Sequence, residues 1–159
     1  MDSSHYLYFA YGSNMSSKRL RAANRAPSAQ AIEVACLEGY RLTFDKVGRD
    51  GSAKCDCERT GLTSDRVYGI VYSIKLSDKP RLDDIEGVGI GYDDATVAVT
   101  SVSGVHLAHT YLATVKNPTL APFHWYKRHV LDGAREWNLP ADYVRMIEQI
   151  TSVDDPTRS

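Results

Sequence analysis

Two short segments of the chain carry residues whose types and spacing suit chemistry on a small anionic ligand. The first runs from Tyr8 to Asn14, where an apolar aromatic stretch leads directly into Gly12, Ser13 and Asn14. A strand that ends at a glycine and is followed at once by a helix leaves backbone N–H groups free at the positive end of the helix dipole. This segment therefore predicts a pocket for a small anion.

The second segment places an acid at the end of a helix. An N-cap, an early proline, two apolar residues three apart and a glycine stop predict this helix: Ser77, Pro80, Leu82, Ile85 and Gly87. Its last residue is then Glu86, where the partly negative helix end disfavours a carboxylate by up to ~1 kcal/mol. That field, with any burial, would raise the pKa of Glu86 above ~4.3 and make it a proton carrier near neutral pH. The alternative is a solvated acid beside Asp83 and Asp84.

The two segments lie within a series of predicted strands and helices, which together determine where the segments sit in the fold. Strands are predicted over 5–11, 54–60, 67–74, 92–102 and 105–115, and two strands or one bent strand within 31–44, broken near Glu38 and Gly39. Helices are predicted over 18–24, 77–86, 122–137 and 140–150, with a loop over 46–52. Strands dominate the middle and helices the end, which predicts an α+β fold whose mixed sheet can curl into a barrel.

The helix that follows the anion pocket is predicted over 18–24. Ser16 or Ser17 can cap it, and Leu20 and Ala23 are expected to face inward. Its basic residues are expected to be solvated: Lys18, Arg19, Arg21 and Arg25. At the other end of the chain, we expect a core over about 6–150 and a frayed tail over 151–159.

Composition excludes several classes of function. The 159 residues suit a single domain, and 43% hydrophobic with 25% charged residues is typical of a globular protein. Because 19 basic residues nearly balance 20 acidic ones, neither a nucleic acid nor a membrane surface is favoured as a partner. The sequence shows no signal segment, and Cys36, Cys55 and Cys57 are an odd number of cysteines, so we expect reduced thiols and a cytoplasmic protein. The five histidines lack ligand spacing, and no metal site is predicted.

A series of motifs in order resembles the γ-glutamylcyclotransferases over nearly the whole chain, from about Tyr6 to Ile150. The motifs are Tyr-Gly-Ser-Asn-Met at 11–15, Val-Tyr-Gly-Ile-Val-Tyr at 67–72, Leu-Asp followed by Glu-Gly-Val within 82–88, Gly-Tyr at 91–92, Thr-Tyr-Leu at 110–112, Tyr-Lys at 126–127, Gly-Ala at 133–134 and Leu-Pro at 139–140. The resemblance implies a small mixed β-barrel flanked by helices. It also implies an enzyme that converts a γ-glutamyl compound to 5-oxoproline and a free amine without metal or organic cofactor. A homodimer stays open, with Trp125 and Trp137 as either interface or core residues.

The same resemblance implies roles for particular residues. Glu86 is the proton shuttle, and the loop of Tyr11, Gly12, Ser13 and Asn14 holds the glutamyl end. Tyr92 and Tyr126 line the pocket, with a packed core position as the alternative for Tyr126. Tyr8 is either pocket wall or core, and Asn14 either contacts the substrate or orders the loop.

The reaction needs these residue types for physical reasons. The α-amino group must attack the δ-carbonyl of the same molecule, so a site that binds the α-carboxylate near Gly12 and Ser13 fixes a folded substrate. One carboxylate can take the amine proton and deliver it to the leaving nitrogen, while the hydroxyl of Tyr92 or Tyr126 binds the substrate carboxylate or the oxyanion. Two alternatives remain: a γ-glutamylamine cyclotransferase of a biosynthetic pathway, and a binding module without turnover.

Overall fold

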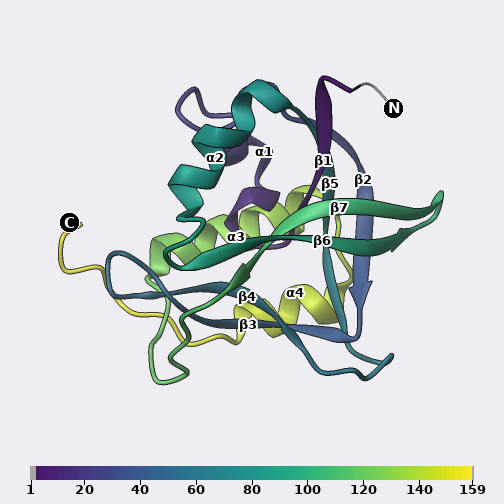
Figure 1. Ribbon diagram of the computed structural model, residues 1–159. Coiled ribbons are helices and arrows are strands. Elements are labelled where there is room, and N and C mark those ends of the chain that lie inside the picture. Colours follow the sequence, from purple (N-terminus) through teal and green to yellow (C-terminus); the bar gives the residue numbers. More distant parts are fainter. Residues whose placement is uncertain (1–2, 159) are drawn as a thin grey trace.

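The computed structural model describes residues 3–158, which form a single α+β domain (Figure 1). The strands are β1 (His5–Ala10), β2 (Gln30–Glu38), β3 (Tyr40–Val47), β4 (Ala53–Arg59), β5 (Arg66–Lys75), β6 (Tyr92–Ser101) and β7 (Gly104–Ala113). The helices are α1 (Ser17–Leu20), α2 (Lys79–Glu86), α3 (His124–Glu136) and α4 (Ala141–Glu148), with short 3-10 turns η1 (Ser13–Met15) and η2 (Leu76–Asp78). The predicted order of strands and helices is confirmed.

Five strands close into a mixed barrel in the order β1-β5-β2-β6-β7. Neighbouring strands pair antiparallel, except that β1 and β7 run parallel where Tyr8 meets His109. Strand β5 lies between β1 and β2, and its Ile70, Val71 and Tyr72 are fully buried. The continuous apolar run of this strand thus reflects burial on both faces, as predicted.

Strands β3 and β4 form a separate two-stranded sheet, which lies alongside α4 in Figure 1. Gly39 has a φ of +81° and turns the chain from β2 into β3, so the predicted break at this point is confirmed. Strand β3 continues to Val47, however, and the loop predicted from residue 46 begins two residues later. Leu42, Phe44 and Lys46 therefore share one buried face of β3.

Helix α3 and β5 together fix the turn η1 that follows β1. A Cβ atom on Gly133 of α3 would lie 2.5 Å from Cβ of Met15 and 2.7 Å from the nitrogen of Ser16, so only glycine permits this approach. The Met15 carbonyl accepts hydrogen bonds from the Tyr72 hydroxyl at 3.0 Å and from Nε1 of Trp137 at 2.9 Å. The loop at the end of β1 is thus held from two sides.

The segment after η1 departs most from the prediction. Ser16 caps α1, because its side chain accepts from the Arg19 N–H at 3.3 Å, but the helix ends at Leu20 instead of continuing to residue 24. The chain then turns back, with the Ala26 N–H bonded to the Leu20 carbonyl. Leu20 is buried as predicted, while the expectations of a buried Ala23 and a solvated Arg25 are both wrong. Helical periodicity does not apply beyond the point where the helix ends.

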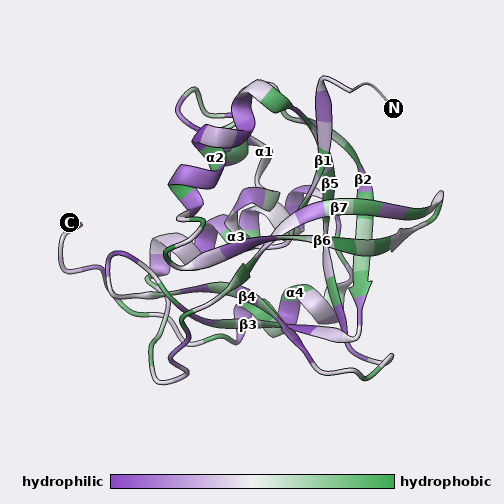
Figure 2. Cartoon of the chain, viewed as in Figure 1, coloured by the Kyte–Doolittle hydropathy of each residue, from purple (hydrophilic) through white to green (hydrophobic). Residues whose placement is uncertain are grey.

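Helix α2 begins two residues later than predicted, because Ser77 lies inside η2 and caps nothing. Pro80 stands in the first turn and Gly87 ends the helix in the left-handed region, with a φ of 80°, as predicted. Hydrophilic residues prevail along α2 in Figure 2. Glu86 is the last residue of this helix, as the sequence predicted.

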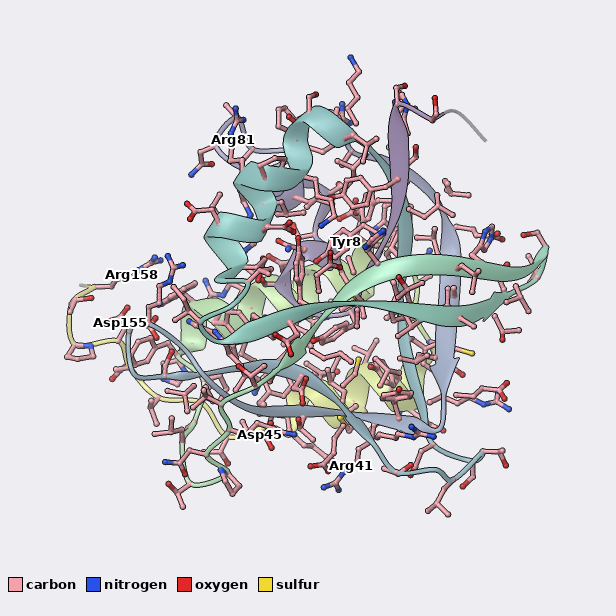
Figure 3. All side chains as sticks on the ribbon, in the orientation of Figure 1. Tyr8, Arg41, Asp45, Arg81, Asp155 and Arg158 are labelled. Atoms are coloured by element: carbon pink, nitrogen blue, oxygen red, sulfur yellow. The ribbon has the colours of Figure 1, made fainter. Side chains whose placement is uncertain are left out.

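The C-terminal segment, expected to fray, makes specific contacts with α3 over its described part, 151–158. The His124 N–H donates to the Val153 carbonyl, and Nε1 of Trp125 donates to Asp155 at 2.9 Å. The Arg158 guanidinium lies 3.9 Å from the centre of the Trp125 ring, and Figure 3 shows it beside Asp155. Trp125 is thus half-buried under its own chain. Across residues 3–158, no helix has the length and apolar character needed to span a membrane.

Candidate active site

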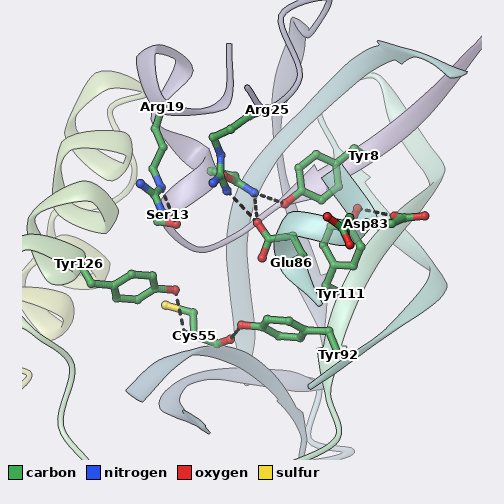
Figure 4. Close-up of polar contacts among 12 residues, drawn as sticks. Tyr8, Ser13, Arg19, Arg25, Cys55, Asp83, Glu86, Tyr92, Tyr111 and Tyr126 are labelled. Carbon is green, nitrogen blue, oxygen red and sulfur yellow. Dashed lines mark hydrogen bonds and ion pairs between the residues drawn. The ribbon is translucent and has the colours of Figure 1, made fainter. Parts of the chain in front are cut away.

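One pocket brings together every site residue predicted from the sequence. We name it the inner pocket, and its lining residues are Tyr8, Tyr11, Gly12, Ser13, Asn14, Cys55, Glu86, Tyr92, Tyr111 and Tyr126. They come from β1, the loop after it, β4, the end of α2, β6, β7 and α3. Figure 4 shows Glu86 facing the tyrosines across this space. Cys55 and Tyr111 are members that the sequence analysis did not select.

The two carboxylate oxygens of Glu86 have different surroundings. Oε1 accepts from Nδ2 of Asn14 at 2.8 Å and from Nη2 of Arg25 at 2.9 Å. Oε2 has no protein partner within residues 3–158. The side chain is 18% exposed, and the Arg25 guanidinium offsets the unfavourable field of the helix end. One oxygen is therefore fixed and the other is available to exchange a proton.

Asn14 is the centre of the polar network around Glu86. Besides its bond to Oε1, Nδ2 lies 3.0 Å from the Tyr8 hydroxyl, and its Oδ1 accepts from Nη2 of Arg25 at 2.8 Å. These contacts connect the loop after β1 to Glu86, Arg25 and Tyr8. Burial raises the pKa of Tyr8 well above its ordinary value, and its phenol stays protonated at neutral pH.

Tyr92 and Tyr126 both contact the backbone of Cys55, but in opposite senses. The Tyr92 hydroxyl donates to the Cys55 carbonyl at 2.5 Å, whereas the Tyr126 hydroxyl accepts from the Cys55 N–H at 2.9 Å (Figure 4). Burial raises the pKa of both phenols well above the ordinary value, so both keep their protons. A hydroxyl oxygen that accepts still has a proton to donate, and this distinguishes Tyr126 from Tyr92.

Cys55 and Tyr111 complete the wall for reasons of packing. Burial raises the pKa of the Cys55 thiol to about 12, which leaves it protonated and a poor nucleophile at neutral pH. Tyr111 donates its hydroxyl to Oδ1 of Asp83 at 2.7 Å, and its carbonyl accepts from the Tyr11 hydroxyl. Both contacts tie β7 to the elements that carry the loop and Glu86.

The loop after β1 keeps the features of an anion site. Within residues 3–158, no protein acceptor pairs with the backbone N–H groups of Gly12, Ser13 and Asn14. A Cβ atom on Gly12 would lie 3.1 Å from Cβ of Cys55, so the glycine keeps this part of the pocket open. Oγ of Ser13 accepts from Nε of Arg19 at 3.1 Å.

A second pocket adjoins the first, and five of its thirteen lining residues are basic. Ser13, Glu86, Tyr92 and Tyr126 belong to both pockets. This outer pocket adds basic side chains from three parts of the chain: Arg19, Arg25, Lys46, Arg49 and Lys54. In the described part of the chain, no group of three or more His, Cys, Asp or Glu side chains is arranged to hold a metal ion.

Sequence reasoning missed three residues that surround Glu86. Arg25 follows the last turn of α1, so the helical pattern gave no reason to expect it inside. From Leu42 on, every second residue of β3 is buried, and Lys46 follows Leu42 and Phe44 in this alternation. A strand predicted to extend two residues further would have placed Lys46 on the buried face. Tyr111 belongs to the Thr-Tyr-Leu motif at 110–112, and that motif could have identified it.

The chain is similar in sequence to a known family and to known enzymes. Residues 66–147 match the model of the AIG2-like family. The γ-glutamylcyclotransferase of Homo sapiens is 31% identical over 161 residues, which cover 96% of this chain and 82% of that protein. The γ-glutamylcyclotransferase of Bos taurus is 29% identical with the same coverage of both chains.

Solved structures show the same architecture. A structure described as a gamma-glutamyl cyclotransferase superposes with a TM-score of 0.85 at 28% identity, and covers 97% of this chain and 92% of that one. A human protein described as uncharacterized gives a TM-score of 0.86 at 29% identity, with 98% and 94% of the two chains covered. The barrel, the second sheet and the helices are thus shared over essentially the whole domain.

Proposed function

Because the chain belongs to the γ-glutamylcyclotransferase family, we propose that it cyclises a γ-glutamyl compound to 5-oxoproline and releases the attached amine, with Glu86 as the proton shuttle. The observation that carries this proposal is the asymmetry of Glu86. Arg25 and Asn14 hold Oε1, while Oε2 has no partner in the described residues and borders the pocket formed by the loop and the tyrosines.

The loop after β1 binds the glutamyl end of the substrate. The unpaired N–H groups of Gly12 and Ser13 receive the α-carboxylate, which bends the substrate so that its α-amino group faces its own δ-carbonyl. Holding two reacting groups in this way is worth up to ~7–11 kcal/mol in the best model systems. The close packing of α3 against η1 makes the loop rigid enough to act in this way.

Glu86 then acts alternately as base and acid. The α-amino group has an ordinary pKa near ~8 and arrives charged, so Oε2 first removes one proton from it. After attack on the δ-carbonyl, the same carboxyl group donates that proton to the nitrogen of the leaving amine, and the carbonyl re-forms as the C–N bond breaks. The carboxylate then takes the second proton from the new ring nitrogen and passes it to the released amine, which leaves as an ammonium ion. Arg25 and Asn14 keep the carboxyl group in place through these transfers.

Tyr126 is the hydroxyl best placed to stabilise the oxyanion that forms at the δ-carbonyl. Its oxygen accepts from the Cys55 N–H, and its proton faces only the Cys55 sulfur, a weak acceptor, whereas Tyr92 donates its proton to the Cys55 carbonyl. A fixed donor in a buried site stabilises a developing negative charge more than water does. Tyr92 serves as pocket wall.

A panel of γ-glutamyl amino acids and γ-glutamylamines, with 5-oxoproline measured by mass spectrometry, tests the reaction. We expect stoichiometric 5-oxoproline and free amine from at least one class. A binding module would instead bind 5-oxoproline in a calorimeter and form no product from any compound. The γ-glutamylamine alternative would appear as turnover confined to amines without a carboxylate.

Glu86→Gln tests the assigned residue. The glutamine keeps an oxygen for Arg25 and Asn14 but cannot carry the proton, so we expect kcat to fall by roughly 10²–10⁴ while 5-oxoproline still binds. Thermal denaturation verifies the fold of the variant, and Asp84→Asn, two residues away on the same helix, is the matched control. Undiminished turnover by Glu86→Gln would contradict the mechanism.

A further inference from the structure

The outer pocket has an excess of positive charge directly beside the reacting groups. Five cationic side chains line it, and its carboxylates are Asp50 and Glu86. The cations therefore outnumber the carboxylates by three. The chain as a whole is nearly neutral, with a formal charge of −1, so this concentration of charge is local.

Two of the five cations are neutralised within the pocket. Arg25 pairs with Glu86 at 2.9 Å, and Nζ of Lys54 pairs with Asp50 at 3.0 Å. The other three are Arg19, Lys46 and Arg49, and none of them has a carboxylate partner in the described residues. Arg19 donates to the Ser13 hydroxyl and Arg49 to the Asp84 carbonyl, which are neutral acceptors.

Lys46 is the most unusual of the three. The residue is only 6% exposed, and its ammonium lies 4.3 Å from the centre of the Tyr92 ring. Burial lowers the pKa of Lys46, and likewise that of Arg19, which is further lowered by Arg25. Keeping such cations partly out of water without a carboxylate costs free energy, and a bound anion would offset that cost.

The position of the outer pocket identifies which part of the substrate reaches it. It shares Ser13, Glu86, Tyr92 and Tyr126 with the inner pocket. If the proposed function holds, the glutamyl end fills the inner pocket and the scissile amide lies at Glu86. The amine to be released then extends into the outer pocket, between Arg19 on α1 and Lys46 on β3.

Resting on that proposed function, we propose that the enzyme prefers γ-glutamyl compounds whose released amine carries two negative charges, as an acidic amino acid does. A single carboxylate would leave two of the three unpaired cations without a counter-charge, whereas two anionic groups on one leaving group would pair two of them, Arg19 of α1 and Lys46 of β3. An amine without a carboxylate would leave all three unpaired.

A comparison of γ-glutamyl-glutamate with γ-glutamyl-glutamine tests the proposal, because the two substrates differ by one charge at nearly constant shape. We expect kcat/KM to be about tenfold higher for the glutamate compound, and γ-glutamyl-butylamine to be the poorest substrate. Raising the salt concentration should reduce the ratio.

Variants of Lys46 and Arg19 test whether the outer pocket causes this ratio of kcat/KM values. Lys46→Met and Arg19→Met should each lower the ratio, and Lys46→Arg should restore most of it. Lys18→Met is the matched control, because Lys18 neighbours Arg19 on α1 but is exposed and outside the pocket, and we expect it to keep the ratio. Circular dichroism verifies that each variant is folded.

The outcomes separate the two proposals. Equal kcat/KM for the two substrates in the wild type would overturn the charge preference and leave the cyclisation standing. A preference that persists unchanged in both Lys46→Met and Arg19→Met would overturn the assignment to the outer pocket. No 5-oxoproline from any compound would overturn both proposals.

Discussion

The inner and outer pockets share a wall but are lined by different kinds of side chain. The inner pocket is lined mainly by phenols and an amide whose hydrogen bonds end on other protein groups, as Asn14, Tyr92 and Tyr111 show. The outer pocket is lined by cations, of which Arg19 and Lys46 have no carboxylate partner in the described residues. A fixed, internally bonded site suits the part that all γ-glutamyl compounds share. A site with unpaired charges suits the part that differs between them.

Replacing Arg25 with methionine should cause the largest change in the inner pocket. Glu86 would lose the guanidinium that holds Oε1, and displacement of a catalytic group by about 1 Å can cost ~10²-fold in rate. We expect a fall in kcat of about that size, with partial recovery in Arg25→Lys. The exposed Arg21→Met is the control. Wild-type kcat in Arg25→Met would show that Glu86 needs no support from this residue.

The paired variants Tyr126→Phe and Tyr92→Phe test which phenol serves the oxyanion. Loss of one oxyanion donor costs ~10²–10³ in kcat in well-studied enzymes, and we expect at least tenfold for Tyr126→Phe. Tyr92→Phe loses only a bond to the Cys55 carbonyl and should change kcat less. Initial rates at saturating substrate measure both. A larger loss from Tyr92→Phe would reverse the assignment.

Asp50→Asn removes one negative charge from the outer pocket and so tests the effect of its net charge. The asparagine keeps the oxygen that Ser52 binds but no longer neutralises Lys54, so the pocket becomes more positive. We expect the preference for γ-glutamyl-glutamate over γ-glutamyl-glutamine to rise about two- to threefold, the size typical of an exposed ion pair. A fall in this ratio would mean that the outer pocket does not act through its net charge.

The Cys55 thiol should have the smallest effect, although it lines the inner pocket. Burial raises its pKa from 9.0 to about 12, so the thiolate forms only as the pH rises toward that value. Alkylation of the native protein by iodoacetamide should therefore be slow at pH 7 and accelerate with rising pH. Cys55→Ser should retain kcat within about threefold, because a protonated thiol is not the nucleophile. Rapid labelling at pH 7 with loss of turnover would indicate a covalent mechanism.

Local patterns were sufficient to predict the parts of the molecule that follow one regular element. The apolar run of β5, the hairpin of β6 and β7, and the glycine stop after Glu86 all appear where the sequence indicated. The loop after β1 and Glu86 were identified because each stands at the end of such an element. Their meeting in one pocket depends on barrel closure between β1 and β7, which no local pattern reveals.

The residues that the sequence concealed lie where regular structure ends. Arg25 reaches Glu86 because the chain turns back after Leu20, and a helical projection placed it in solvent. Lys46 lies on the buried face of β3, where a charged residue is the least expected type. Arg25 was missed because burial of its charge is decided by a tertiary partner, Glu86, which is far away in sequence. Lys46 was missed because the strand was predicted to end at Phe44, before it.

A crystal structure with bound 5-oxoproline tests the central claim most directly, because the product marks where the glutamyl part lies. We predict its carboxylate on the N–H groups of Gly12 and Ser13, and its ring nitrogen within about 3 Å of Oε2 of Glu86. A product whose carboxylate lies on Arg19 or Lys46 in the outer pocket, with its ring nitrogen out of reach of Glu86, would contradict the account.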